Sequence, residues 1–108
     1  MSEIRKEIGK IERIELAEED GRIGIWFTLS GKGWGCGDFW GDWSTPRSAH
    51  TSWTEDDRRK NLGGALMRLV KLFEDAKVNS LSALIGKPIE AAFWDGSLKT
   101  WRILTEVL

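Results

Sequence analysis

Four side chains that could do chemistry lie close together in the middle of the sequence. Cys36, Asp38, Asp42 and His50 include the only cysteine and the only histidine. A thiol, an imidazole and a carboxylate are the groups of a cysteine nucleophile, and the same donors can bind a metal ion. No paired ligand spacing such as Cys-x-x-Cys and no nucleophile-elbow sequence accompanies them. We therefore predict no enzyme activity, no bound metal and no cofactor, and we expect Cys36 to be a small buried apolar side chain.

The same part of the sequence is unusually rich in tryptophan, glycine and aspartate. Residues 31–43 contain five of the twelve glycines and three of the seven tryptophans. Tryptophan anchors protein–protein interfaces, and its ring also stacks on nucleic-acid bases and attracts cations. Aspartate beside such rings would add polar specificity. The sequence therefore predicts a binding surface made by Trp34, Asp38, Trp40, Asp42, Trp43 and Trp53.

Two other interpretations of this segment compete with a binding surface. In the first, Trp34, Trp40 and Trp43 pack in the core or at a sheet edge over the glycines. In the second, consecutive glycine amides bind a phosphate in an anion nest. The second is disfavoured because no Gly-Lys-Ser/Thr sequence follows, and because Asp38 and Asp42 would repel a phosphate. The packing interpretation stays open.

Composition limits the classes of protein to which the chain can belong. Its 108 residues are expected to form one domain, residues 1–108. Lysine and arginine number 16 against 17 acidic residues, and this net charge of −1 excludes electrostatic wrapping of duplex DNA. No apolar run approaches the roughly 20 residues that cross a membrane. A single cysteine forms no internal disulfide, so we expect a cytoplasmic protein.

The first half of the chain is predicted to form a three-stranded meander. Residues 8–16 are rich in isoleucine and favour a strand, which leads to an Asp-Gly turn at residues 20–21. Residues 23–29 are apolar at every odd-numbered position, so this face of a second strand should be buried. We expect a third strand with a bulge over residues 33–40, followed by a loop over residues 41–53.

A long helix is predicted after this loop. Thr54 is a natural N-cap, and Asp57 at the third helical position completes a capping box. We expect the helix to end near residues 78–79, where Asn79 can adopt the left-handed conformation. The predicted apolar stripe of the helix consists of Leu62, Leu66, Leu69, Val70 and Phe73.

Two strands are expected at the end of the chain. A short helical turn at residues 80–86 should precede a strand over residues 89–94. An Asp-Gly turn at residues 95–96 then predicts a hairpin. The last strand, residues 98–107, carries apolar side chains on both faces, so we expect it to lie in the centre of the sheet.

The resulting element order is βββ-α-ββ. It predicts an α+β domain in which an antiparallel sheet packs against one main helix. An OB-like barrel has the same order of strands and helix, and it is the alternative.

Several segments resemble small accessory proteins encoded by phages and prophages. They are Ile8-Gly9-Lys10-Ile11, Gly33-Trp34-Gly35 with Gly37-Asp38-Phe39, residues 53–58, Gly86-Lys87-Pro88-Ile89 and residues 98–107. The resemblance spans nearly the whole chain and implies no catalytic residues. Proteins of this kind often act by binding, as inhibitors of host defence, as sequestering proteins for signalling nucleotides or as helpers of replication.

These observations lead to one functional expectation and one alternative. We expect a non-enzymatic binding protein that engages and inhibits a host protein or complex, as anti-CRISPR-like inhibitors do. The alternative is a protein that binds or sequesters single-stranded nucleic acid or a nucleotide on an OB-like sheet. A glycine-faced strand at a sheet edge can pair with the same strand of a second copy, so a homodimer is a further expectation. No membrane partner is expected.

Overall fold

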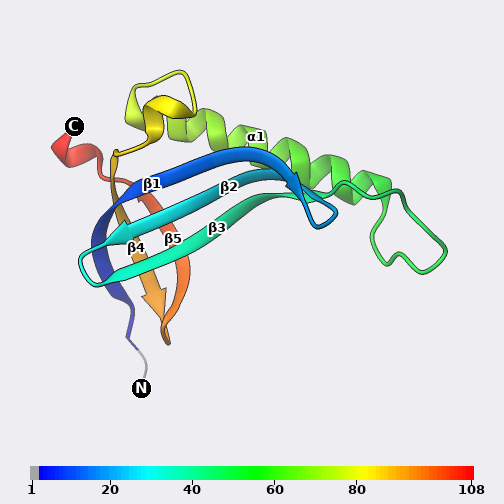
Figure 1. Cartoon of the computed structure of the whole chain (residues 1–108), viewed down its shortest axis with the longest axis horizontal. Coiled ribbons are helices and arrows are strands. Elements are labelled where there is room, and N and C mark those ends of the chain that lie inside the picture. Colours follow the sequence, from blue (N-terminus) through cyan, green and yellow to red (C-terminus); the bar gives the residue numbers. More distant parts are fainter. Residues whose placement is uncertain (1–2) are drawn as a thin grey trace.

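A computed structural model of the chain describes residues 3–108 (Figure 1). These residues form one five-stranded antiparallel sheet and one long helix, in the predicted order βββ-α-ββ. The elements are β1 (Arg5–Glu19), β2 (Arg22–Gly31), β3 (Trp34–Trp43), α1 (Glu55–Ala76), η1 (Ser82–Leu84), β4 (Pro88–Trp94), β5 (Ser97–Ile103) and η2 (Thr105–Val107), where η marks a 3-10 turn. The predicted α+β architecture is confirmed.

The long strand β1 joins two hairpins into a single sheet. Its residues 9–19 pair with β2, and its residues 5–10 pair with β4, so the strand order is β3-β2-β1-β4-β5. Both predicted Asp-Gly turns are confirmed. Asp20 and Gly21 have φ of 53° and 77°, and Asp95 and Gly96 have φ of 51° and 77°. Positive φ at both central residues is what a two-residue hairpin turn requires.

The sheet does not close into the alternative OB-like barrel. Strands β3 and β5 are both edges of the sheet and do not pair with each other. The prediction that the last strand is central is therefore wrong. That strand also ends at Ile103, and Val107 lies exposed in η2 instead of continuing the strand. Leu98 does not lie on the opposite face, because a register shift between Ala92 and Phe93 pairs it with Phe93 and it packs against the core. Leu104 lies beyond the end of the strand.

The predicted strand boundaries need three corrections. Strand β1 is longer than residues 8–16, and β3 continues to Trp43, so the loop begins at residue 44 instead of 41. The register of β2 with β3 is regular, so the expected bulge in β3 is absent. A register shift lies instead in β1 between Ile11 and Arg13. The shift lets Ile11 and Ile14, which are three residues apart, both be buried.

The start of α1 follows the predicted capping box. The Asp57 amide donates to Thr54 Oγ1 at 3.0 Å, and the Thr54 amide donates to Asp57 Oδ2 at 3.0 Å. The helix ends at Ala76, earlier than predicted, and Lys77 takes the left-handed cap conformation with φ of 58°. Asn79 is therefore not the cap.

The apolar stripe of α1 was only partly predicted. Ala65, Leu72 and Ala76 are its buried residues, with Leu69 and Phe73 packed against the core. Leu66 is 62% exposed, and Val70 is also exposed. Alanines at the centre of the contact face let the helix approach the sheet closely, and Leu66 points about 100° away from Ala65. Hydrophobicity alone had placed the centre of the stripe on the larger side chains.

Two adjacent glycines in α1 give a testable prediction about stability. Nothing lies within 4 Å of a Cβ added at Gly63 or at Gly64. Alanine at either position should therefore raise the free energy of unfolding by about 0.5–1 kcal/mol, because glycine has a low helix propensity and a flexible unfolded state. Urea unfolding followed by circular dichroism measures the change. A loss of stability in either variant would contradict the open environment of these residues.

Candidate functional site

Strand β3 divides the predicted site residues between two faces of the sheet. Successive residues of a strand point to opposite faces. Asp38, Trp40 and Asp42 point toward α1, while Phe39 and Trp43 point to the face that α1 does not cover. The two faces have different roles.

Trp40 belongs to the interior, and Asp38 lies half-buried beside it. Trp40 is 6% exposed, and its ring stacks on Trp101 of β5 with centroids 5.4 Å apart. Asp38 Oδ2 accepts hydrogen bonds from the indole N–H groups of Trp40 at 3.0 Å and of Trp101 at 2.7 Å. Asp38 Oδ1 accepts from the Phe39 amide at 2.9 Å. Asp38 therefore joins β3 to β5, the two sheet edges that share no strand pairing.

Trp34 is a packing residue as well. Its ring lies across the backbone of Gly31 and of Gly9, which face it in the same row of the sheet. The far side of the ring contacts Phe93 edge-on, with centroids 5.3 Å apart. For Trp34 and Trp40, the structure thus shows the packing alternative that the sequence left open.

The uncovered face of β2 and β3 carries an aromatic surface, which we call the outer aromatic surface: Arg22, Trp26, Phe39 and Trp43. The rings of Trp26 and Phe39 lie 4.2 Å apart, and the Arg22 guanidinium lies 5.1 Å from each ring centroid. Trp43, which pairs with Arg22 across the strands, is 42% exposed. Of the predicted tryptophans in β3, only Trp43 reaches the surface substantially.

Trp26 and Phe39 were not among the predicted members of this surface. Their signal was present, because residues 22, 24, 26 and 28 alternate with the buried face of β2. Phe39 lies over Gly24 and Gly41, which leave room for its ring.

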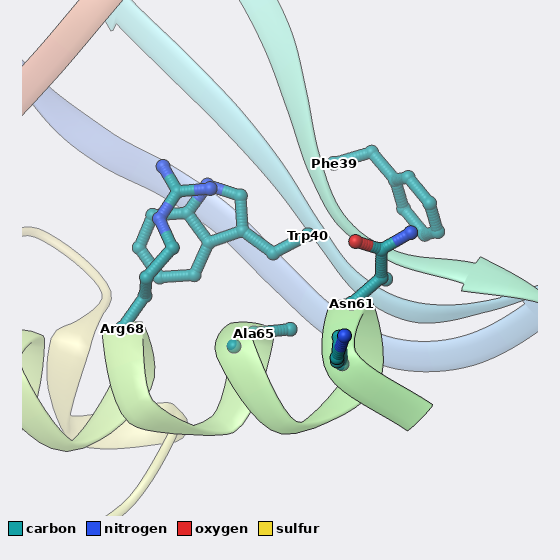
Figure 2. A pocket seen from close by; sticks show the side chains of 8 residues that line it. Phe39, Trp40, Asn61, Ala65 and Arg68 are labelled. Atoms are coloured by element: carbon teal, nitrogen blue, oxygen red, sulfur yellow. The ribbon is translucent and has the colours of Figure 1, made fainter. Parts of the chain in front are cut away.

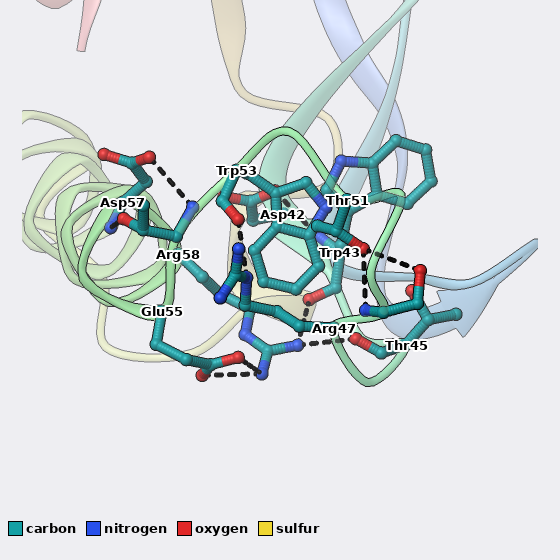
Figure 3. Close-up of polar contacts among 11 residues, drawn as sticks. Asp42, Trp43, Thr45, Arg47, Thr51, Trp53, Glu55, Asp57 and Arg58 are labelled. Carbon is teal, nitrogen blue, oxygen red and sulfur yellow. Dashed lines mark hydrogen bonds and ion pairs between the residues drawn. The ribbon is translucent and has the colours of Figure 1, made fainter.

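The loop of residues 44–54 projects beyond the end of the sheet, and its base is held by Arg58 (Figure 3). The Arg58 guanidinium donates to the carbonyl groups of Trp43 at 3.3 Å and Thr45 at 2.8 Å. It also binds both carboxylate oxygens of Glu55 at 2.6 and 2.7 Å. The Trp53 ring centroid lies 4.7 Å from this guanidinium. Trp53, which was predicted to belong to the binding surface, therefore supports the loop.

Asp42 and Asp38 each accept a hydrogen bond from the backbone amide of the next residue, at the open edge of β3. Asp42 Oδ1 accepts from the Trp43 amide at 2.7 Å, as Asp38 accepts from the Phe39 amide. Asp42 Oδ2 accepts from Asn61 of α1 at 2.7 Å. Two edge amides are therefore already bonded to aspartate side chains. This arrangement disfavours the pairing of β3 with another strand.

Cys36 and His50 occupy different parts of the molecule. Cys36 is partly buried on the α1-facing side of β3, and His50 lies in the exposed loop. Burial raises the pKa of the Cys36 thiol, and the charge of Asp38 raises it further. A raised pKa keeps the sulfur protonated near neutral pH, which is the opposite of what a nucleophile needs. Among residues 3–108, no group of three or more histidine, cysteine or acidic side chains could hold a metal ion.

A groove of about 270 Å³ lies between the open edge of β3 and α1 (Figure 2). Its residues come from two elements: Phe39, Trp40 and Gly41 from β3, and Lys60, Asn61, Gly64, Ala65 and Arg68 from α1. The Arg68 guanidinium lies 4.2 Å above the Trp40 ring. Lys60 and Arg68 were not predicted to act together, although their spacing of eight residues places them on one side of a helix.

Comparisons with known proteins add no family to this description. The outer aromatic surface, the projecting loop and the groove are therefore the basis for assigning a function. Within residues 3–108, no helix is both long enough and apolar enough to cross a membrane. The chain matches no protein-family model, no curated protein and no solved structure.

Proposed function

We propose that the protein is a non-enzymatic binding protein that engages another protein through the outer aromatic surface and the adjoining loop of residues 44–54. The single observation that carries this proposal is the exposure of Trp43 beside Arg22, Trp26 and Phe39 on a sheet face that α1 does not cover. Tryptophan and arginine are the residue types most enriched in interface hot spots.

The rigid support of this surface adds to the proposal. Arg58 and Trp53 hold the loop against the end of β3, so less conformational freedom is lost when a partner binds. Loops presented by a rigid scaffold are common binding elements. The resemblance to phage and prophage accessory proteins suggests the setting. There the partner is a host protein or complex in the bacterial cytoplasm, and binding inhibits it, as in host-defence inhibition.

Two other partners are weaker proposals. Single-stranded nucleic acid or a nucleotide would stack on aromatic faces, but Trp26 and Phe39 pack on each other and lie beneath Arg22. Homodimer formation through the edge of β3 is disfavoured because Asp38 and Asp42 already accept hydrogen bonds from two edge amides. A protein partner at the outer face encounters neither obstacle.

A comparison of two tryptophans tests the proposal. Trp43 and Trp94 are 42% and 41% exposed, but Trp94 lies in β4, at a distance along the sheet from the projecting loop. The immobilised wild-type protein should retain a partner from a bacterial extract, and Trp43→Ala should lose it. Trp94→Ala should retain it, because it removes the same chemistry from a different place.

The results that would overturn the proposal are specific. Equal retention by wild type and Trp43→Ala would remove the outer aromatic surface from the interface. Quenching of tryptophan fluorescence by oligo-dT, abolished by Trp43→Ala, would favour the nucleic-acid alternative instead.

A further inference from the structure

We propose that the groove between α1 and β3 binds an extended, acidic segment of the partner protein. This inference rests on the proposed binding function, and it identifies a second contact region on the other face of the sheet. The partner segment is recognised by its carboxylates, which pair with Arg68, Lys60 and Lys71 along one side of α1.

The groove continues along the helix past Arg68. A second hollow of about 300 Å³ shares Trp40 and Arg68 with the first, and it extends to Lys71 of α1 and Arg102 of β5. Lys60 and Arg68 are eight residues apart on the helix, which is about 12 Å. Residues four apart in an extended chain are about 13 Å apart and lie on the same face. Acidic residues at positions i and i+4 of an extended segment therefore match this spacing.

Arg68 is the centre of the proposed site because its charge is not neutralised. Among residues 3–108, no carboxylate forms an ion pair with Arg68, whose guanidinium lies over Trp40. Lys60 pairs with Asp56 at 3.0 Å, but both side chains are largely exposed, so the pair contributes little and can be exchanged. Lys71 is held by Asp75 at 2.8 Å and contributes a weaker, shared charge.

The acids near the groove are already engaged. Asp42 accepts hydrogen bonds from Asn61 and from the Trp43 amide, and Asp38 accepts from two indoles and the Phe39 amide. Asp75 lines the second hollow and is paired with Lys71, and Arg102 is paired with Glu90 and Glu106. The charge that is left over at the groove is therefore the positive charge of Arg68. An acidic ligand complements it.

The aromatic residues decide between an acidic peptide and a nucleic acid. Trp40 is buried, with Arg68 over its ring and Trp101 stacked on it, so it offers no free face for a base. The Phe39 ring packs with Trp26. A groove that offers cations but no free aromatic face does not meet the requirements of single-strand recognition. An acidic peptide needs only the cations.

The α1 wall of the groove leaves room for an extended segment at Gly64. A Cβ added at this residue meets nothing within 4 Å. No side chain therefore projects into the groove from this position of the helix. Because Asp38 and Asp42 occupy the Phe39 and Trp43 amides, recognition depends on side-chain charges more than on a continuous β ladder.

A fluorescein-labelled peptide of four Glu-Thr repeats tests the inference by fluorescence anisotropy. Wild type should bind it, and Arg68→Glu should weaken binding by at least roughly tenfold, the usual order for removing a charged partner. Arg59→Glu makes the same charge change on another side of α1, and it should alter affinity by less than about threefold.

A second pair of variants tests the shape without changing charge. Gly64→Met should obstruct the groove and weaken binding by about tenfold, whereas Gly63→Met should not, although both gain similar helix propensity. Melting temperatures confirm that all four variants are folded. Equal losses of peptide affinity at positions 68 and 59, or at positions 64 and 63, would overturn the inference. It would also be overturned if oligo-dT bound in an Arg68-dependent way and the peptide did not bind.

The peptide experiment tests the groove and the capture experiment tests the outer aromatic surface, so either one can fail without the other. Trp43→Ala should leave peptide binding unchanged while it abolishes partner capture. If the peptide does not bind but capture depends on Trp43, the groove is wrong and the proposed function stands. If the peptide binds as expected but no partner is captured, the proposed surface on the outer face is wrong.

Discussion

Asp38→Ala is expected to lower the free energy of unfolding by about 3 kcal/mol or more. The Asp38 carboxylate accepts hydrogen bonds from the indole N–H groups of Trp40 and Trp101 and from the Phe39 amide. Both tryptophans are buried, so removal of the carboxylate leaves two donors without an acceptor. A buried donor left in this state costs about 1–3 kcal/mol. Urea unfolding monitored by circular dichroism measures the change.

Asp42→Ala is the matched control for this prediction. Its carboxylate accepts from the Trp43 amide and from Asn61, and both bonds lie at the exposed end of β3. Water can replace them, so we expect a loss of about 1 kcal/mol or less. Similar losses for the two variants would show that the tryptophan contacts of Asp38 contribute little. Asp38→Asn should fall between them, because an amide retains one acceptor oxygen.

Gly31→Ala is expected to destabilise the protein by about 3 kcal/mol or more, because it cannot be accommodated without moving a tryptophan. A Cβ at Gly31 would lie 2.2 Å from Trp34 Nε1 and 2.6 Å from the Ile8 carbonyl oxygen. The carbonyl belongs to β1 and cannot move without disturbing the sheet. The Trp34 ring would have to leave its position against Phe93.

Gly35→Ala provides the control within the same hairpin. The nearest atom to its added Cβ is the Leu29 carbonyl oxygen at 3.7 Å, which is ordinary contact. We expect its stability to stay within about 0.5 kcal/mol of wild type. Thermal unfolding of the two variants, measured together, separates the steric effect from a general intolerance of side chains near the turn. A stable Gly31→Ala would mean that Trp34 is not packed on this backbone.

Local signals in the sequence were sufficient to predict most elements of the fold. The Asp-Gly turns and the Thr54 capping box depend on the conformations of a few adjacent residues, and all are present in the structure. The alternation in β2 likewise predicted its buried face. These features need no knowledge of the rest of the chain.

Features that depend on distant partners could not be predicted in the same way. The register shift after Ile11 is set by the pairing of β1 with β2, which the sequence of β1 alone does not reveal. The end of β5 at Ile103 depends on its partner, because Ile103 pairs with Ile89 near the start of β4. The centre of the α1 contact face depends on how closely Ala65 and Ala76 let the helix approach.

The candidate site shows the same limit. Tryptophan content indicated the segment that carries an unusual surface, but exposure depends on the face to which each side chain points. Trp40 and Trp43 are three residues apart in one strand, and they therefore face opposite sides. The predicted strand ended at Trp40, so the two residues were expected to be neighbours on one surface. Strand length was the missing information.

The alternation of β3 has a consequence for how the sequence can change. Even-numbered positions such as Trp34, Asp38 and Trp40 are constrained by packing, whereas Gly35 and Gly37 are exposed on the other side, where an added Cβ would make only ordinary contact with a backbone oxygen. Substitutions at the open positions can thus alter what the outer face recognises with little loss of stability. The two faces of one strand thus separate the residues that maintain the fold from the residues that can be substituted when the binding partner changes.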